Sequence, residues 1–181
     1  MRYSTKTMVV IGFLAALSTV LMWFQVPLLP AAPFLEYDLS DVPVLMGGFA
    51  LGPIAGSLIA TVKALVFLLT KGKSGFIGAF MNLVSTVSLV FVASYIYRLF
   101  KKSFTGSVVG YVLGTIVMTL LMVLTNIYVA LPIWGIPVDQ IKPLVISAII
   151  PFNLLRGLIS CVLTAILYKR FSSIMDKFVS K

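Results

Sequence analysis

The sequence predicts an all-α integral membrane protein with six transmembrane helices, the second of them short, and a long outer loop after the first helix. Two features of the composition carry this prediction. Of the 181 residues, 60% are hydrophobic and only 10% are charged, whereas about a quarter of the residues in an ordinary soluble domain are charged. The mean hydropathy is +1.12. A soluble fold of this size cannot bury so much apolar surface, so the lipid bilayer must solvate part of it.

Long apolar runs that cross a bilayer are expected to be helical, because the backbone there must satisfy its own hydrogen bonds. The first run follows a basic N-terminus, as in a signal peptide, but it continues to Trp23 without an A-x-A cleavage pattern, so we expect it to remain as a helix. The second run ends at Gly52-Pro53 and is too short to cross at about 1.5 Å per residue. We expect it to end partway, buried against its neighbours. Pro, Gly and charged residues separate the other runs. The expected helices, which form one domain over residues 1–181, are 7–25, 42–52, 53–70, 76–98, 106–132 and 144–170.

The distribution of basic residues predicts the orientation in the membrane. With the N-terminus inside, the inner ends carry nine Lys and Arg residues and the outer loops carry three, which are Lys71, Lys73 and Lys142. The positive-inside rule then puts both termini in the cytoplasm of a multi-pass cell-membrane protein. The net charge of +9 does not indicate a nucleic-acid partner, since the basic residues form small groups beside apolar runs. The inner residues are Arg2, Lys6, Arg98, Lys101, Lys102, Lys169, Arg170, Lys177 and Lys181.

The residue types exclude most catalytic chemistry. With a single cysteine, Cys161, and no histidine, an internal disulfide is excluded and a Cys/His metal site is not expected. The stretch "TKGKSG" (70–75) ends like a phosphate-binding loop, but its first glycine position is Phe67 and it lies in an outer loop rather than between a strand and a helix. The sequence contains no Ser/His/Asp or Cys/His pattern. We therefore expect no enzyme, no cofactor and no ATP hydrolysis by this chain alone.

Acidic residues gather in the outer loop that leads into the short second helix. Glu36, Asp38 and Asp41 lie within six positions of one another. Asp38 or Asp41 at a helix start is also an ordinary N-cap. Two cations, Lys63 and Arg156, lie inside spans, where an Arg at the bilayer centre costs roughly 2.5–3.5 kcal/mol on insertion scales. Arg156 should therefore face a polar cavity or a partner such as Asp41, unless it snorkels to the interface.

Two amides accompany Arg156 on the outer side. Asn153 precedes it by three residues and so shares its helix face, and Asn126 lies in the outer half of the fifth helix. Converging polar groups in an apolar cavity are what a small-molecule site needs. The aromatic residues nearby either stack on a flat ring or anchor the helices at the interface. These aromatic residues are Tyr128, Trp134 and Phe152.

Small residues mark a second surface. The first helix carries Gly12-x-x-x-Ala16 beside Ala15, and glycines and alanines recur in the second and third helices from Gly47 to Gly56. Residues of this size let helices approach closely. They serve either internal packing or the docking of a partner. In the fourth helix, where Asn82 shares a face with Ser85 and Thr86, we favour a contact between helices for Asn82.

Two motifs carry a resemblance to a known family. "DLSDVPVLMGGFALGPIAG" (38–56) and "PFNLLRG" (151–157) resemble the riboflavin-specific substrate-binding subunits of energy-coupling factor (ECF) transporters, and the resemblance covers nearly the whole chain. It implies six membrane helices and an outward-facing pocket closed by the first long loop. Its implied ligand is riboflavin, and its implied partners are a transmembrane coupling subunit and two cytoplasmic ATPase subunits.

The resemblance also implies roles for individual residues. Asn126 is similar to the fifth-helix amide that reads the flavin ring, Asn153 and Arg156 to the sixth-helix pair near the ligand, and Asp41 to the loop acid beside it. The family often has lysine where Arg156 stands. Its docking motif in the first helix is usually A-x-x-x-A, and here Gly12, Ala15 and Ala16 occupy that region.

Other functions remain open on the residues alone. One alternative is a substrate-binding subunit of an ECF transporter for another vitamin, thiamin or biotin. A stand-alone secondary transporter driven by ions is another, although it would be favoured by acids within the span cores, where the sequence has none. A structural membrane protein is the third, but it leaves Arg156 unexplained.

Overall fold

The computed structural model describes residues 3–30, 32–70 and 75–179, with side chains described through residue 173. Within these ranges the chain is helical apart from one short ribbon of two strands, which confirms the expected all-α class. The elements are α1 (Thr5–Leu21), β1 (Val26–Pro27), β2 (Glu36–Tyr37), α2 (Asp41–Leu51), α3 (Pro53–Thr70), α4 (Gly75–Leu99), α5 (Phe104–Thr125), the π-helical turn η2 (Asn126–Ala130), α6 (Leu131–Ile133), α7 (Val138–Leu144), the π-helical turn η3 (Val145–Ile149) and α8 (Ile150–Val179).

Four helical segments of the described chain are long and apolar enough to cross a membrane. They are Pro53–Thr70, Gly75–Leu99, Phe104–Ile133 and Val138–Ser173, and the apolar helices α1 and α2 are shorter, with 17 and 11 residues. The longer segments arise because α5 continues through η2 into α6, and α7 continues through η3 into α8.

The helix bounds differ from the expected ones by more than two residues at three places, one of which is the end of the last helix, at Val179 rather than at residue 170. The first helix ends at Leu21 rather than at residue 25, because the chain turns there into the strand that begins at Val26. The last helical segment begins at Val138, before Pro143 rather than after it. A proline within a helix removes one backbone hydrogen bond, and the π-helical turn at Val145–Ile149 follows directly, so the helix continues with altered pitch instead of ending.

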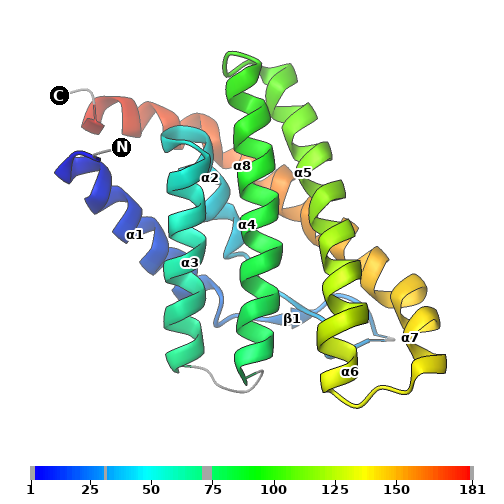
Figure 1. Ribbon diagram of the computed structural model, residues 1–181. Coiled ribbons are helices and arrows are strands. Elements are labelled where there is room, and N and C mark those ends of the chain that lie inside the picture. Colours follow the sequence, from blue (N-terminus) through cyan, green and yellow to red (C-terminus); the bar gives the residue numbers. More distant parts are fainter. Residues whose placement is uncertain (1–2, 31, 71–74, 180–181) are drawn as a thin grey trace.

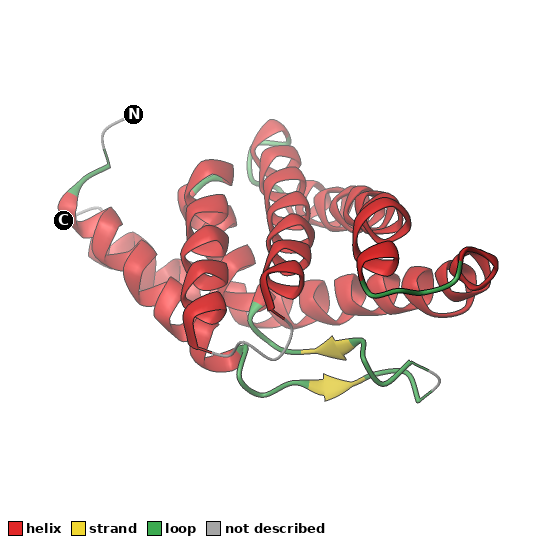
Figure 2. Cartoon of the chain, turned by 60° about the horizontal axis from the view of Figure 1, so that its bottom comes forward, coloured by secondary structure: helices red, strands yellow, loops and turns green. Residues whose placement is uncertain are grey.

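The helices form a bundle whose two ends differ in character (Figure 1). Both termini and the turn between α4 and α5 lie at one end, and the β1–β2 ribbon and the link from α6 to α7 lie at the other, which we call the loop end. α4 and α5 run side by side, and α8 crosses the bundle obliquely. In Figure 2 the two antiparallel strands lie across the loop end, with Val26 opposite Tyr37.

Glycines allow the closest helix contacts. A Cβ atom on Gly114 of α5 would lie 2.9 Å from the carbonyl oxygen of Leu89 on α4, and a Cβ on Gly56 of α3 would lie 2.8 Å from Cα of Gly48 on α2. Real Cβ atoms do not approach so closely, so only glycine fits at these positions. The small residues of the second and third helices therefore serve internal packing at this contact.

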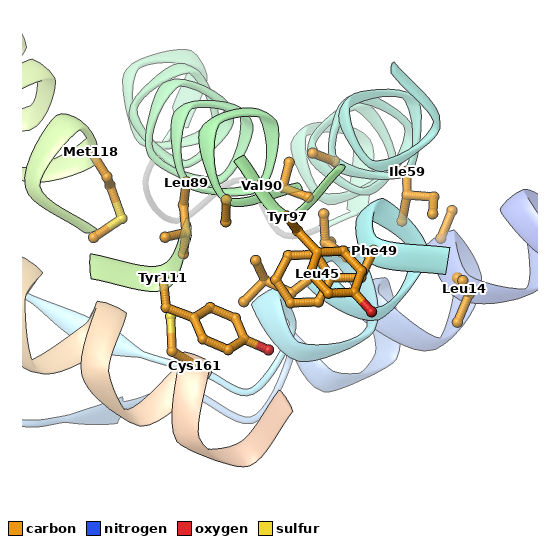
Figure 3. Packing of buried hydrophobic residues seen from close by; sticks show 14 of the residues in the cluster. Leu14, Leu45, Phe49, Ile59, Leu89, Val90, Tyr97, Tyr111, Met118 and Cys161 are labelled. Atoms are coloured by element: carbon orange, nitrogen blue, oxygen red, sulfur yellow. The ribbon is translucent and has the colours of Figure 1, made fainter. Parts of the chain in front are cut away.

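The hydrophobic core of the described chain has two clusters: one contains Phe49, and the other consists of Leu131, Val145 and Ile149 near the link from α6 to α7. Phe49 of α2 packs against Tyr97 and Tyr111 with ring centroids 4.6 and 5.0 Å apart. Figure 3 shows these rings together with Leu45 and Cys161. Because α2 carries Phe49 into this cluster, its first residue, Asp41, is fixed at the opposite end of the same short helix.

Candidate functional site

The first residue of α2 lies at the centre of a buried network of polar side chains. The carboxylate of Asp41 is 1% exposed and pairs with two cations. Its Oδ2 accepts a hydrogen bond from Arg156 Nε at 2.8 Å, and its Oδ1 accepts one from Arg156 Nη2 at 3.1 Å. Bidentate pairs of this kind are among the strongest side-chain interactions. The expected pairing of Asp41 with Arg156 is confirmed, and Arg156 is 7% exposed rather than snorkelling to a surface.

Lys63 of α3 is the second cation of this network. Its Nζ donates to Asp41 Oδ1 at 3.2 Å, to Ser40 Oγ at 3.0 Å and to Thr86 Oγ1 at 3.0 Å. The hydroxyl of Thr86 itself donates to Asp41 Oδ1 at 2.8 Å. The network thus connects α2, α3, α4 and α8, and its one carboxylate pairs with both of its cations, since buried charges must be paired.

The alternative role of Asp41 as a helix N-cap is not what the structure shows. The residue at the N-cap position of α2 is Ser40, which makes no capping hydrogen bond with its side chain. The Asp41 carboxylate instead accepts its hydrogen bonds from Lys63, Thr86 and Arg156. A negative charge in the first turn is in addition favourable for the helix dipole.

The loop between α1 and α2 is fixed to this network and to α8. Asp38 is buried and its Oδ1 accepts a hydrogen bond from the backbone N–H of Ser40 at 2.8 Å. The Tyr37 hydroxyl lies 3.1 Å from Ser160 Oγ on α8. Burial raises the pKa of Tyr37 to about 12, so this phenol stays neutral at physiological pH. The contact of Tyr37 with Ser160 holds the loop against α8, and the β1–β2 ribbon ties two parts of the loop to each other.

A cavity of about 380 Å³ opens at the loop end, between this loop and the helices. That volume falls within the range of small-molecule sites, about 300–1,000 Å³. Arg156 reaches the cavity, as do Gln25 and Glu36 of the loop and Asn82 of α4. Among its other lining residues are four aromatic side chains and three methionines: Phe34, Phe67, Trp134, Phe152, Met22, Met81 and Met122. The cavity therefore combines flat apolar walls with a few polar groups.

The two amides expected at the site lie beside it. Asn126 is 3% exposed and its Nδ2 donates to Met122 O at 2.7 Å; Asn153 is 1% exposed and its Nδ2 donates to Ile149 O at 2.8 Å. Neither belongs to the described residues that line the cavity. Within the described chain, however, Asn153 Oδ1 is a buried acceptor without a hydrogen-bond partner. Asn126 begins the turn η2, and Ile149 ends the turn η3. π-helical turns of this kind occur frequently at functional sites.

The small-residue surface of the first helix divides into two parts. Ala15 is 1% exposed and belongs to the internal core. Gly12 and Ala16 are exposed, and a Cβ on Gly12 would meet nothing within 4 Å. Ala15 therefore packs inside the bundle, and an open surface remains at Gly12 and Ala16.

Sequence reasoning missed several residues of the site. It noted Lys63 only as a charge within a span, and Thr86 only as part of a polar helix face. A lysine in an apolar helix needs a buried counter-ion, so Lys63 together with the nearby acids was a usable signal. Glu36 and Gln25 of the loop gave no such signal, because a loop has no periodicity from which the direction of a side chain follows.

A bundle of apolar, membrane-spanning helices with a partly aromatic cavity beside a buried ion network is the architecture of a membrane protein that binds a small molecule. The model of the family described as "ECF transporter, substrate-specific component" matches residues 6–168, and the chain belongs to this family. The members of this family are components of transporters, in agreement with the expectation that the chain is not an enzyme.

Curated relatives are similar over nearly the whole chain. The riboflavin transporter RibU of Staphylococcus aureus is 33% identical, with 95% of this chain and 93% of the relative covered. RibU of Streptococcus thermophilus is 34% identical, with 96% and 86% covered. The riboflavin transporter FmnP of Bacillus subtilis is 25% identical, with 90% of both chains covered.

A solved structure shares the fold. It is described as the structure and mechanism of the S component of a bacterial ECF transporter, and it superposes with a TM-score of 0.81 at 32% sequence identity. The match covers 94% of this chain and 97% of that chain. The fold is therefore that of an ECF substrate-specific component.

Proposed function

We propose that this chain captures riboflavin from outside the cell and delivers it across the membrane together with an ATP-driven energy-coupling module. The observation that carries the proposal is the cavity at the loop end, which has aromatic and methionine walls and Arg156 at one side. A flat heteroaromatic ring with polar edges is complementary to such a cavity. The relatives that match the whole chain are riboflavin transporters.

Within this proposal, Asp41, Asn126, Asn153 and Arg156 form the polar part of the site. Arg156 reaches the ligand directly, and Asp41 holds its guanidinium through Nε and Nη2. The unpartnered Asn153 Oδ1 is suited to accept a hydrogen bond from a ring N–H. The position of Asn126 beside the cavity-lining Met122 supports a contact after a change of side-chain rotamer.

The same proposal includes the arrangement in the membrane. All six helical runs embed as one domain, and both termini face the cytoplasm. The described basic residues support this orientation, because Arg98, Lys101 and Lys102 lie at the turn between α4 and α5, on the side of the termini, and Lys142 lies at the loop end. Arg2, Lys71, Lys73 and Lys181, which also entered the charge count, lie outside the described residues, and the side chain of Lys177 is not described.

The partners in this proposal are a transmembrane coupling subunit and two cytoplasmic ATPase subunits. Family membership supports them, since the family consists of substrate-specific components of ECF transporters. The exposed Gly12 and Ala16 of α1 offer a surface where another helix can approach closely.

The ligand is tested by titrating the purified protein with riboflavin. Flavin fluorescence should be strongly quenched, because the ring becomes stacked among the aromatic side chains of the cavity. Thiamin and biotin serve as controls and should neither bind nor displace the flavin. Binding of thiamin or biotin without any quenching of riboflavin would show that the ligand is a different vitamin.

A further inference from the structure

Lys63 has no direct part in the function proposed above, yet its side chain is 0% exposed. Its ammonium group has three N–H donors, and it has three acceptors: Ser40 Oγ, Thr86 Oγ1 and Asp41 Oδ1, all within 3.2 Å. A buried charge is tolerated only when it is paired and hydrogen-bonded in this way. Lys63 does not belong to the described residues that line the cavity. It is thus a fully coordinated charge that lies behind the site.

The groups that coordinate Lys63 are the same groups that hold Arg156. Asp41 Oδ1 accepts hydrogen bonds from both Lys63 and Arg156. Thr86 Oγ1 likewise accepts from Lys63 at 3.0 Å and from Arg156 Nη2 at 3.3 Å. Any movement of Asp41 or Thr86 therefore changes where the guanidinium of Arg156 lies. The hydrogen bonds of Arg156 to Asp41 and Thr86 are made by Nε and Nη2, and Arg156 also reaches the cavity.

The local charges also depend on Lys63. Asp38, which is 6% exposed, acts electrostatically on both Lys63 and Arg156. With Lys63 present, two carboxylates face two cations. Without it, Asp38 and Asp41 both act on Arg156 alone, so the electrostatic forces on the guanidinium change. Lys63 thus contributes to the charge balance around Arg156.

We propose that Lys63 is a positioning residue for ligand recognition: it holds Asp41 and Thr86 so that Arg156 is presented to the cavity. This inference rests on the proposed riboflavin binding. It extends the site from the cavity wall to a residue behind it, since Asp41 and Thr86 link Lys63 to Arg156. Lys63 acts through these two residues and not by touching the ligand.

The test measures riboflavin affinity by fluorescence quenching for four proteins that are folded by gel filtration and thermal unfolding. In Lys63→Met, which removes the charge and keeps the length, affinity should fall by about 10- to 100-fold. In Ser40→Ala, which removes one acceptor of Lys63 and leaves every charge in place, it should fall by about 2- to 10-fold. Ser94→Ala is the matched control, because Ser94 is buried and hydrogen-bonded to Val90 O within its own helix; its affinity should equal that of the wild type.

A charge rescue separates positioning from general support of the fold. Asp41→Asn leaves Lys63 and Arg156 as two cations without their common partner. Adding Lys63→Met to Asp41→Asn removes one of these two cations and its repulsion on Arg156, so the double variant should bind riboflavin at least as tightly as Asp41→Asn alone. If Lys63 only supports the fold, the fold-losses of riboflavin affinity in Asp41→Asn and in Lys63→Met should multiply in the double variant.

Three other results would overturn the positioning role of Lys63. Wild-type affinity in Lys63→Met, or in Ser40→Ala if Lys63→Met yields no folded protein, overturns the positioning role while riboflavin binding by the wild type stands. Multiplying losses in the double variant overturn it as well. An absence of quenching in the wild-type protein overturns the proposed function, and the role of Lys63 with it.

Discussion

One carboxylate organises the polar centre of this protein. Asp41 accepts hydrogen bonds from Arg156, Lys63 and Thr86, which come from three helices. Replacing such a buried network with apolar residues often leaves stability unchanged or raises it. We therefore propose that the arrangement of these charges beside the cavity serves ligand recognition rather than stability.

The amide of Asn153 provides a test at the level of a single residue. Its Oδ1 is buried without a partner in the described chain, and a ligand N–H would satisfy it. Asn153→Leu should weaken riboflavin binding by about 5- to 150-fold, since the loss of a buried hydrogen-bond partner costs about 1–3 kcal/mol. The measurement is a quenching titration of protein that unfolds at the wild-type temperature. Unchanged affinity would remove Asn153 from the site, and Asn126→Leu tests the other amide in the same way.

Sequence reasoning found part of this site and missed part, for a physical reason. An Arg within an apolar helix needs a partner, and Asp41 was an acid close to the membrane, so the pair was predictable. Helical spacing, however, shows only which residues share a face of one helix. It does not show which faces of different helices meet, and so the convergence of Lys63 and Thr86 on Asp41 required the packed bundle.

At the level of elements, the loop from α1 to α2 forms one wall of the cavity. It contributes Gln25, Phe34 and Glu36 to the lining. The sequence predicted a long loop there, and it placed the start of α2 within one residue. It did not predict the β1–β2 ribbon, because two strands of two residues each leave no periodic pattern.

The contact between Tyr37 and Ser160 should act as a latch that keeps this loop closed. Tyr37 is 4% exposed, and its hydroxyl lies 3.1 Å from Ser160 Oγ on α8. Tyr37→Phe removes the hydrogen bond and keeps the ring, so bound riboflavin should dissociate about 2- to 10-fold faster, as expected for one net hydrogen bond. Stopped-flow measurement of fluorescence recovery gives the rate.

Two further variants make the latch measurement specific. Ser160→Ala should accelerate dissociation as much as Tyr37→Phe, and the double variant should be no faster than either, since both remove the same contact. Tyr128→Phe is the control, because Tyr128 is 76% exposed, and its dissociation rate should equal that of the wild type. Additive effects of the two changes would show that Tyr37 and Ser160 act separately.

At the level of the whole molecule, composition and hydrophobic runs were sufficient to predict a helical membrane protein. The expected fifth helix, 106–132, already included the residues of η2. The composition and hydrophobic runs could not predict that α7 continues through η3 into α8, because Pro143 looks like the end of a helix in the sequence. Within a bundle, neighbouring helices can stabilise such irregular turns, so the last helical segment begins at Val138 rather than at residue 144.

The helix α1 has one face that packs inside the bundle and one face that is exposed. Ala15 is 1% exposed and lies in the core, whereas Gly12 and Ala16 are exposed. Gly12 precedes the cavity residue Met22 by ten positions, about 15 Å along a helix. A bulky side chain at Gly12 therefore projects outward without touching the cavity.

Gly12→Leu and Ala16→Leu should consequently leave riboflavin binding by the isolated protein unchanged. The same substitutions should reduce co-purification with the coupling module and abolish ATP-dependent uptake, because close packing of small residues is the main source of helix association within lipid.

Ala15→Leu is the matched comparison on the adjacent face, and it should impair folding and binding together by overpacking the core. Val112→Leu, at a 54% exposed position of α5, should change neither property. Titration, pull-down and uptake on the same preparations distinguish these results: full uptake by both Gly12→Leu and Ala16→Leu, or loss of their riboflavin binding, would exclude this face of α1 as the docking surface.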